Sequence, residues 1–306
     1  MEAYAKTTTL IILDVPAGAS LSIDTMSFSA TTSFRGIKYI GEGIHLLTYG
    51  LDTSELGMRS GFFFIGKPGH VLAWKWDKQT EQLGRIEEQV HGKDLQERNS
   101  IFGGYLTLGL ESLHPYLTAF PPPTDDTKIA WTDLTSFITV DILNRVLPQD
   151  WTFTSQTPST NDEATDQLSS LPSSKSEAIL NFTSINLKRT FNPQAIGRER
   201  TDQILDKSYY LESLLQKLPD ELALLGEFQL SFLTMLYMNN FSGFDTWKNI
   251  FTVLCDCKAA LRAREKLFRN FLTVLRQQFE MCSEETFNEV ILEGNFVANN
   301  LKVCSL

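Results

Sequence analysis

The spacing of apolar residues changes along the chain, and this change restricts the fold more than any other feature of the sequence. From residue 8 to residue 77, short runs of alternating apolar and polar residues are separated by Gly or Pro. Such alternation is typical of half-buried β-strands. After residue 205 the apolar residues recur every three or four positions, as in amphipathic helices. The sequence therefore predicts an α+β protein, with a β-rich N-terminal domain and an all-helical C-terminal domain.

A low-complexity segment lies between the two patterns. Residues Thr154 to Ala178 read TSQTPSTNDEATDQLSSLPSSKSEA, which is rich in Ser and Thr and has no aromatic residue. Such a stretch buries too little apolar area to offset the entropy lost on ordering. We therefore predict a β-rich domain at residues 1–153, a flexible linker at 154–178 and a helical domain at 179–306. We expect that most of the linker can be deleted without loss of stability.

The predicted strand at residues 71–76 shows the alternation most clearly. Trp74 and Trp76 flank Lys75, so one face carries two indole rings and the other face carries a charge. We expect at least one of the indoles to lie in the core. Residues 92–106 and 110–117 are predicted to be helical or irregular, residues 131–148 to form one or two short helices ended by Pro148, and residues 178–188 to form a further strand.

The C-terminal pattern predicts a bundle around one almost wholly apolar helix. A first stripe ends at Pro219, and Asp220 is a suitable N-cap for the next helix, predicted at Glu221–Met238. Ser242 and Asp245 form an S-x-x-D variant of the capping box before a third helix. The predicted stripes are Leu211, Leu214, Leu215 and Leu218; Trp247, Ile250, Phe251 and Leu254; and Phe268, Phe271, Leu272, Leu275 and Phe279.

Composition excludes several classes of function. The net charge of −10 argues against binding nucleic acid through overall charge. No apolar run reaches the ~20 residues of a membrane helix, and the N-terminus has no signal-peptide pattern. The five cations Arg262, Arg264, Lys266, Arg269 and Arg276 are expected to lie on a solvated helix face, although contact with RNA or an acidic partner stays open.

No motif of a catalytic, metal or nucleotide site is present in the sequence. The cysteines Cys255, Cys257, Cys282 and Cys304 lack zinc-site spacing, so we expect reduced and mostly buried thiols. The histidines His45, His70, His91 and His114 are expected in a strand and in turns. Asp24 and Glu227 could serve as general bases, but neither has a recognisable partner in the sequence. We therefore predict no catalytic, metal or cofactor site.

Two blocks of the sequence resemble the AAR-two (alternative-repression) splicing factor family. The first block runs from DVPAGASLSID through FRGIKYIGEGIH to MRSGFFF, and the second contains LDKSYYL, LLGEFQLSFLTML and DTWKNIFTVLC. Gly41 departs from the family pattern, in which Pro is common. The matching residues of the first block are Val15, Pro16, Gly18, Ile23, Asp24, Phe34, Gly36, Ile37, Lys38, Ile40, Gly43, His45, Arg59, Gly61 and Phe62.

The resemblance implies a fold and a role. It implies a VHS-like helical domain and a non-enzymatic factor that assembles the U5 small nuclear ribonucleoprotein, in the nucleus and the cytoplasm. The implied partner is the large U5 scaffold protein, pre-mRNA-processing factor eight, through its ribonuclease-H-like and Jab/MPN-like domains. Binding there would delay the U5 helicase; no direct contact with nucleic acid or membrane is implied. The family's C-terminal tail can add a strand to the partner, and the ending LKVCSL leaves the bridging of both partner domains open.

Two other classes of function stay open. One is a hydrolase or isomerase with an unrecognised site between the domains, and the other is a VHS-type adaptor that binds peptides in trafficking. Co-purification discriminates between these classes. Ser242 is a candidate regulatory phosphorylation site, because a phosphate at a helix N-terminus would add close to two negative charges beside a bound partner.

Overall fold

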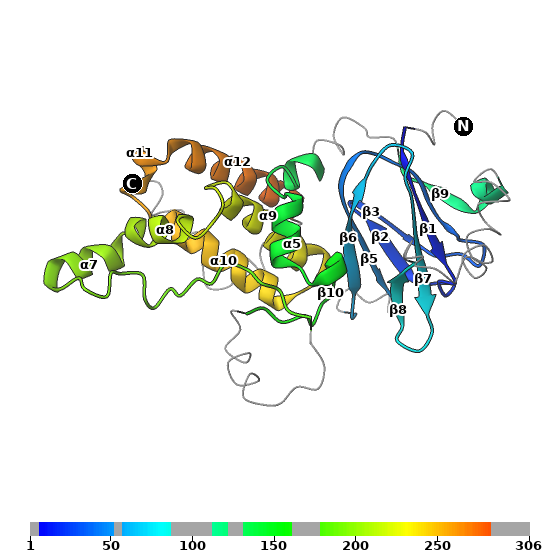
Figure 1. Ribbon diagram of the computed structural model, residues 1–306, viewed down its shortest axis with the longest axis horizontal. Helices are drawn as coiled ribbons and strands as arrows, with labels where there is room; N and C mark the ends of the chain where they lie inside the picture. The colour runs from blue at the N-terminus through cyan, green and yellow to red at the C-terminus, as the bar shows by residue number, and fades with distance from the viewer. Residues whose placement is uncertain (1–5, 52–56, 87–111, 122–130, 161–177, 283–306) are drawn as a thin grey trace, which may run out of the picture. The chain divides into compact units, whose positions relative to one another are not determined.

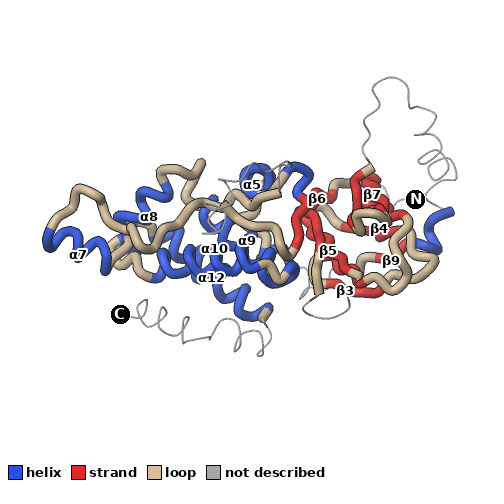
Figure 2. The backbone as a smooth tube through the Cα atoms, turned by 90° about the horizontal axis from the view of Figure 1, so that it is seen from below, coloured by secondary structure: helices blue, strands red, loops and turns tan. Residues whose placement is uncertain are grey.

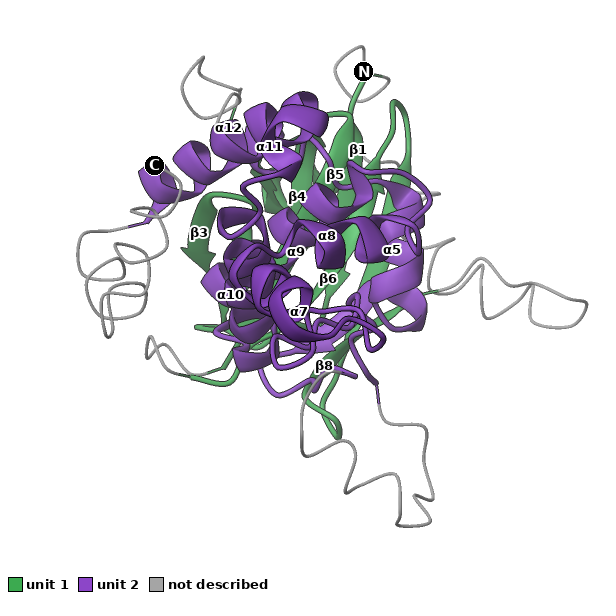
Figure 3. Cartoon of the chain, turned by 90° about the vertical axis from the view of Figure 1, so that its left-hand side faces the viewer, with its two compact units in different colours: residues 1–124 green, residues 125–306 purple. Residues whose placement is uncertain are grey.

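The chain divides into two compact units, Met1–Thr124 and Asp125–Leu306 (Figures 1 and 3). The computed structural model describes residues 6–51, 57–86, 112–121, 131–160 and 178–282. In these ranges the first unit is built mainly of strands and the second mainly of helices, which confirms the α+β class. The predicted helical segment at 92–106 lies outside the described residues.

The division between the units comes earlier than the predicted boundary at residue 153. The reason is that the segment that begins at residue 131 belongs to the second unit. A helical turn at 131–134 and α5 (Val140–Val146) precede Pro148, as predicted. The side chain of Gln229 accepts a hydrogen bond from the Phe137 N–H (2.7 Å) and donates one to the Asp133 carbonyl (2.6 Å). These bonds attach the segment to a helix far along the chain.

One sheet of the first unit is centred on β1 (Thr8–Leu13). Its strand order is β8 (Gln82–Arg85), β7 (Val71–Asp77), β1, β4 (Gly36–Ile40) and β9 (Leu117–Ala119). Strand β1 runs parallel to β7 and antiparallel to β4, and β4 runs parallel to β9. Every residue of β1 is buried, which fits its continuous apolar run rather than strict alternation.

The other sheet of the first unit is antiparallel. It contains, side by side, β6 (Ser60–Gly66), β5 (Gly43–Gly50), β2 (Ser20–Ile23) and β3 (Met26–Ser29). The short turn between β2 and β3 contains Asp24, which has a positive φ of 52°. Asp and Asn tolerate this left-handed conformation better than most residues do. A tight β2–β3 hairpin therefore forms without Gly in the turn.

The main core of the first unit joins side chains from both sheets. Trp74 and Trp76 are only 4% and 5% exposed, so the predicted burial of the indole face is confirmed. The Trp74 ring stacks on Phe62 with the ring centroids 4.3 Å apart. A second cluster covers the opposite face of the β1 sheet, where Leu113 and Leu117 pack on Ile11 and Leu13.

In the second unit, α9 (Ala223–Met238) is the central helix. It contacts α5, α10 (Phe241–Cys255) and α12 (Glu265–Met281). Figure 2 shows two further helices, α7 (Gly197–Leu205) and α8 (Ser208–Leu215), farther along the same unit. The short α11 (Ala260–Ala263) precedes α12. The second unit also contains the 3-10 helix η2 (Gln149–Trp151) and strand β10 (Thr152–Thr154).

Helix α9 is buried nearly all round, as its composition predicted. Phe228 stacks on Trp247 of α10 with the ring centroids 5.6 Å apart, and the Trp247 indole N–H donates to Gln278 of α12 at 2.8 Å. Each fully buried Phe contributes ~1.5–3 kcal/mol through its removal from water. At Gly226 the helix approaches α5 and the residues before it so closely that a Cβ would lie 2.4 Å from the Phe137 carbonyl oxygen and would also clash with the Ile142 side chain of α5. Only glycine fits this crossing.

Several local predictions for the second unit are confirmed. Helix α8 ends at Leu215, before Pro219. The predicted stripes on α8 and α10 are buried. Asp220 stands just before α9, and its carboxylate accepts the N–H groups of Leu222 (2.7 Å) and Ala223 (3.0 Å). The helix begins at Ala223 with Leu222 at its N-cap position, so the predicted cap and helix start are two residues too early.

Other local predictions are wrong. Residues 178–188 form one isolated bridge, Ser159 to Leu180, instead of a strand. Leu272 is 54% exposed, because it points away from the stripe formed by Phe268, Phe271 and Leu275. Arg262 and Arg264 lie in α11 and at the junction before α12, so the five cations do not share one helix.

Among the described helices, none is long and apolar enough to cross a membrane.

Candidate functional site

The junction between α9 and α10 holds Ser242, the residue singled out in the sequence. Helix α9 ends at Met238, its C-cap Asn239 has a left-handed backbone (φ 52°), and α10 begins at Phe241. The N-cap of α10 is Asn240, and its side-chain oxygen accepts the Gly243 N–H at 2.8 Å. Ser242 therefore lies in the first turn of the helix, and the predicted capping box of Ser242 and Asp245 is wrong. The connection is too short for the cap to fall at Ser242.

Asn240 also fixes a distant segment of the chain. Its side-chain NH₂ group donates to the carbonyl oxygens of Thr154 (3.1 Å), Ser155 (3.3 Å) and Thr157 (2.9 Å). Asn240 is 1% exposed, and these bonds satisfy the buried donor of its side chain and provide the carbonyl oxygens with a donor inside the protein. Residues 154–160, predicted as the start of the flexible linker, are thus held against the α9–α10 junction. The remainder of the predicted linker, 161–177, lies outside the described residues.

The outer face of the junction carries an exposed aromatic residue beside a cation. Phe241 is 70% exposed, whereas its neighbour Ser242 is 6% exposed. The Lys248 ammonium lies 5.9 Å from the Phe241 ring centroid and 4.5 Å from that of Phe244. Exposed aromatic side chains are more typical of protein–protein contacts than of the rest of a protein surface. We name Phe241, Phe244 and Lys248 the junction patch.

Glu227, considered as a general base from the sequence, has three partners in the structure. Its carboxylate accepts the Thr183 N–H (2.7 Å) and hydroxyl (2.6 Å) and pairs with Arg145 (2.7 Å). Burial raises the pKa of the Glu227 carboxyl, while the bonds from Thr183 and the charge of Arg145 lower it. Both oxygens of the Glu227 carboxylate are thus bound by residues of this chain. We conclude that Glu227 has a structural role and holds the segment around residue 183 on α9.

Asp24 also has a partner, His45, at 2.6 Å between carboxylate Oδ2 and ring Nδ1. The other ring nitrogen of His45, Nε2, lies 3.1 Å from the Gly41 carbonyl oxygen, and Asp24 accepts the Leu46 N–H at 3.0 Å. Because a carbonyl can only accept, Nε2 must carry a proton, and a further proton must lie between Nδ1 and Asp24. Burial raises the pKa of Asp24, and the bond and charge of His45 lower it. The pair locks the β2–β3 turn to β5.

The remaining candidate groups are dispersed. His114 belongs to the 3-10 helix η1 (His114–Tyr116) and contacts Lys38, His70 lies in a turn, and His91 lies outside the described residues. Cys255 and Cys257 are buried and Cys282 is partly buried, all three as free thiols, while Cys304 lies outside the described residues. In the described part of the chain, no group of three His, Cys, Asp or Glu side chains could hold a metal ion.

The cations of α11 and α12 largely pair with carboxylates of the same unit. Arg264 binds Glu212 at 2.7 Å and Glu221 at 3.2 Å, linking three parts of the bundle. Arg269 and Arg276 pair with glutamates four residues away. These pairs support the interpretation as a solvated polar face rather than as an RNA-binding surface.

Three residues of this region escaped the sequence-based search, namely Asn240, Arg145 and Thr183. The pair Asn239–Asn240 directly before an apolar helix was a usable signal, because Asn favours both the left-handed helix end and the N-cap. Arg145 and Thr183 had no such signal. Their partner, Glu227, is more than forty residues from Thr183 in sequence. Local patterns of residue spacing cannot predict a contact between residues so far apart.

Comparisons with known proteins match both parts of the chain. A model of the AAR2 N-terminal domain matches residues 6–148, and a model of the AAR2 C-terminal repeat region matches residues 182–305. Protein AAR2 homolog of Homo sapiens is 26% identical over 331 residues, which cover 96% of this chain and 81% of the relative. The homolog of Caenorhabditis elegans is 25% identical, with 98% and 86% covered. The A1 cistron-splicing factor AAR2 of Saccharomyces cerevisiae is 24% identical, with 96% and 84% covered.

Proposed function

Because this chain belongs to the AAR2 family, we propose that it acts in pre-mRNA splicing as a non-enzymatic assembly factor. The observation that carries the proposal is the match of both family models, in order, to 6–148 and 182–305. The relative in Saccharomyces cerevisiae is named a splicing factor. A protein that matches such a relative over 96% of its own length is expected to share its general role.

The proposed complex is the U5 small nuclear ribonucleoprotein during its assembly. The partner is the C-terminal region of the large U5 scaffold protein, with its ribonuclease-H-like and Jab/MPN-like domains, and binding there keeps the U5 helicase away until maturation. The exposed aromatic of the junction patch and the acidic charge of −10 support a protein contact over a nucleic-acid contact. We propose that the complex forms in the cytoplasm and the nucleus.

The dispersal of reactive groups supports a role without catalysis. Asp24 and Glu227, the two acids considered as bases, are each occupied by partners within the same unit and are 3% and 0% exposed. A general base must reach the proton that it removes from a substrate. A hydrolase or isomerase that uses these acids would first have to break buried ion pairs.

Affinity purification tests this proposal. The tagged chain, expressed in cells and recovered at moderate salt, is expected to return the U5 scaffold protein and to lack the U5 helicase. Recovery of coat or cargo proteins instead would favour the trafficking adaptor. A double variant of the junction patch, Phe241→Ser with Lys248→Gln, is expected to return less of the scaffold protein, because Phe241 is exposed and Lys248 partly exposed, so that their replacement leaves the core intact.

Ser242 enters the proposal as a candidate point of regulation. Its hydroxyl is buried beside the exposed Phe241, so a kinase could reach it only after the first turn of α10 opens. A phosphate there would prevent that turn from closing into its present position, because Gly243 already packs against Ser231 and Thr234. Phosphorylation would then disrupt the junction patch and release a partner bound to it.

A further inference from the structure

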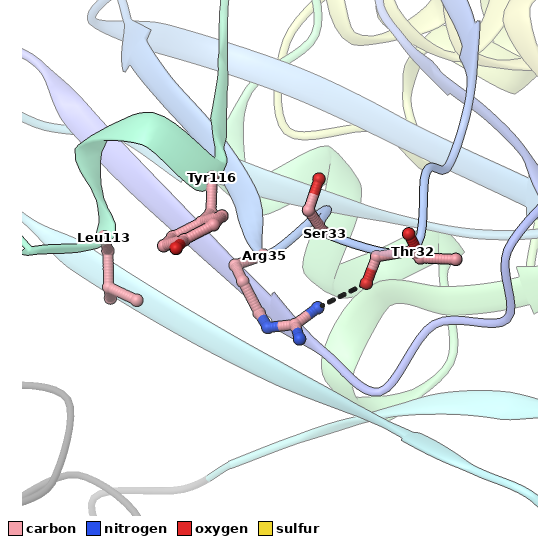
Figure 4. Close-up of a pocket in the computed structure, with 5 residues that line it drawn as sticks. All are labelled: Thr32, Ser33, Arg35, Leu113 and Tyr116. Carbon is pink, nitrogen blue, oxygen red and sulfur yellow. Dashed lines mark hydrogen bonds between the residues drawn. The ribbon is translucent and has the colours of Figure 1, made fainter.

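A pocket of about 350 Å³ opens in the first unit beside the loop that leads into β4. Its described lining consists of Thr32, Ser33, Arg35, Leu113 and Tyr116 (Figure 4). Thr32, Ser33 and Arg35 precede β4, whereas Leu113 and Tyr116 flank the start of η1 and the start of β9. The parallel pairing of β4 with β9 brings the two segments together, and the Arg35 N–H donates to the Tyr116 carbonyl at 2.9 Å.

The guanidinium group of Arg35 is held in one orientation by the backbone. Its Nη1 atom donates to the carbonyl oxygens of Phe34 (2.7 Å) and Thr32 (3.3 Å), and Figure 4 shows the second of these bonds. The Nε and Nη2 atoms donate to no atom of the described residues. Together Nε and Nη2 form the edge of the guanidinium that binds a carboxylate through two parallel hydrogen bonds. The fixed Nη1 lowers the entropy that such binding would cost.

The surroundings of this edge favour a negative group. No carboxylate is among the described lining residues. The Lys38 ammonium also lies beside η1, where it donates to the His114 carbonyl at 2.8 Å, and its described partners include no carboxylate. Neither Arg35 nor Lys38 therefore forms an ion pair with a described residue, in a chain that has ten more acidic than basic residues. A cation that has no ion pair attracts acidic groups to this place.

We propose that the Arg35 pocket binds the carboxylate of an Asp or Glu side chain of a protein partner. The edge of one guanidinium matches the planar carboxylate in shape and in charge. A phosphate carries close to two negative charges, of which Arg35, the only cation among the described lining residues, balances one, whereas a carboxylate carries a single charge. Leu113 and the ring of Tyr116 offer apolar contact to the methylene groups of an acidic side chain. This inference rests on the proposed function only for the identity of the partner.

The first test uses the full chain alone, so it does not depend on the partner. The Arg35 Nε–H signal and the backbone N–H signals of Ser33 and Tyr116 are followed by NMR while acetyl-glutamate amide, acetyl-glutamine amide or inorganic phosphate is added. We expect saturable shifts that are strongest with the glutamate compound, whereas the Nε–H signal of Arg85, an exposed arginine of the same unit, does not shift. In Arg35→Lys, which has no Nε–H group, the backbone shifts of Ser33 and Tyr116 are expected to be lost. Equal shifts with glutamine amide, tighter binding of phosphate, or no saturation would each overturn the proposal. Arg35→Lys is used because it keeps the charge and removes only the two-pronged edge.

The second test measures binding to the purified C-terminal region of the U5 scaffold. Arg35→Gln is expected to weaken binding roughly tenfold, whereas Arg85→Gln leaves it unchanged. One acidic residue of the scaffold, when neutralised, should weaken binding to the wild-type chain and have no further effect on Arg35→Gln. Unchanged binding of Arg35→Gln, or self-association of the chain through Arg35, would overturn the proposed occupant. If the wild-type chain fails to bind this scaffold region, the proposed function is wrong. The NMR titration still shows whether the Arg35 pocket binds a carboxylate.

Discussion

The side-chain NH₂ of Asn240, the N-cap of α10, donates to the carbonyl oxygen of Thr157 at 2.9 Å, across more than eighty residues of sequence. The same side chain caps the helix through its oxygen atom. Asn240 therefore caps the N-terminus of α10 and also holds the segment that follows β10.

Replacing Asn240 tests both roles of its side chain. Asn240→Ala should lower the free energy of unfolding by ~2–3 kcal/mol, because the cap is lost and buried carbonyls lose their donor. Asn240→Asp keeps the capping oxygen but directs a carboxylate at three carbonyl oxygens, so it should destabilise at least as much. Urea unfolding measures both effects, with Asn249→Ala, on an outer position of the same helix, as the control. Wild-type stability in Asn240→Asp would contradict the assigned hydrogen bonds.

Ser242 variants separate a packing role from a regulatory one. Ser242→Ala should cost less stability than Ser242→Glu, because it removes no cap and fits the same space. Ser242→Glu should lower the melting temperature, because a charge cannot be buried in the first turn of α10 without a partner. Scaffold binding is measured beside thermal unfolding at a temperature where both variants are folded. Regulation at this site requires Glu to bind more weakly than Ala; equal binding would leave Ser242 with a packing role only.

The Asp24–His45 pair gives the first unit a pH-dependent stability. Since burial raises the pKa of Asp24 above 3.8, the folded protein holds this proton more tightly than the unfolded chain does. Protonated Asp24 therefore stabilises the folded protein. This stabilisation is complete at a pH below the ordinary pKa of an Asp carboxyl, and it is lost as the pH rises through the raised pKa of Asp24 in the folded protein. The difference in unfolding free energy between the wild type and Asp24→Asn should therefore fall as pH rises from about 4 towards 7. Asp14→Asn removes an exposed carboxyl of the same unit as the control, and a difference that grows with pH would contradict this direction.

The thiols should react slowly in the folded protein. Burial raises the pKa of Cys282 to about 11, and burial followed by the charges of Asp206 and Asp256 raises the pKa of Cys257 still further. At pH 8 about one thiol in a thousand with a pKa of 11 is ionised. Mass spectrometry after iodoacetamide treatment should find Cys257 and Cys282 unmodified until urea is added. Rapid alkylation of native Cys257 would show that it is accessible and ionised.

The sequence predicted those features of the fold that depend on local periodicity. The burial of Trp74 and Trp76 and the apolar helix α9 follow from the spacing of neighbouring residues, and both are found. The position of the α10 cap was mistaken because Ser242 and Asn240 are both good capping residues. Helix packing decided between them, since Gly243 must approach α9 closely.

Polar contacts between distant segments could not be predicted in this way. The partners of Glu227 and Asp24 lie 21 to 82 residues away, so no local pattern announces them. For the same reason the segment at 154–160 was mistaken for linker. Its composition is that of a mobile chain, but the amide of Asn240 supplies the bonds that order it.

Competition for the U5 scaffold tests the proposed role most directly. The purified C-terminal region of the scaffold is immobilised with a fixed amount of the U5 helicase, and the full chain is added in increasing amounts. An assembly factor that delays the helicase should bind the scaffold and displace the helicase in proportion to its own binding, and the junction-patch double variant and Arg35→Gln should do so less effectively. Absence of scaffold binding by the wild-type chain, or stable binding of chain and helicase together, would contradict the proposed function.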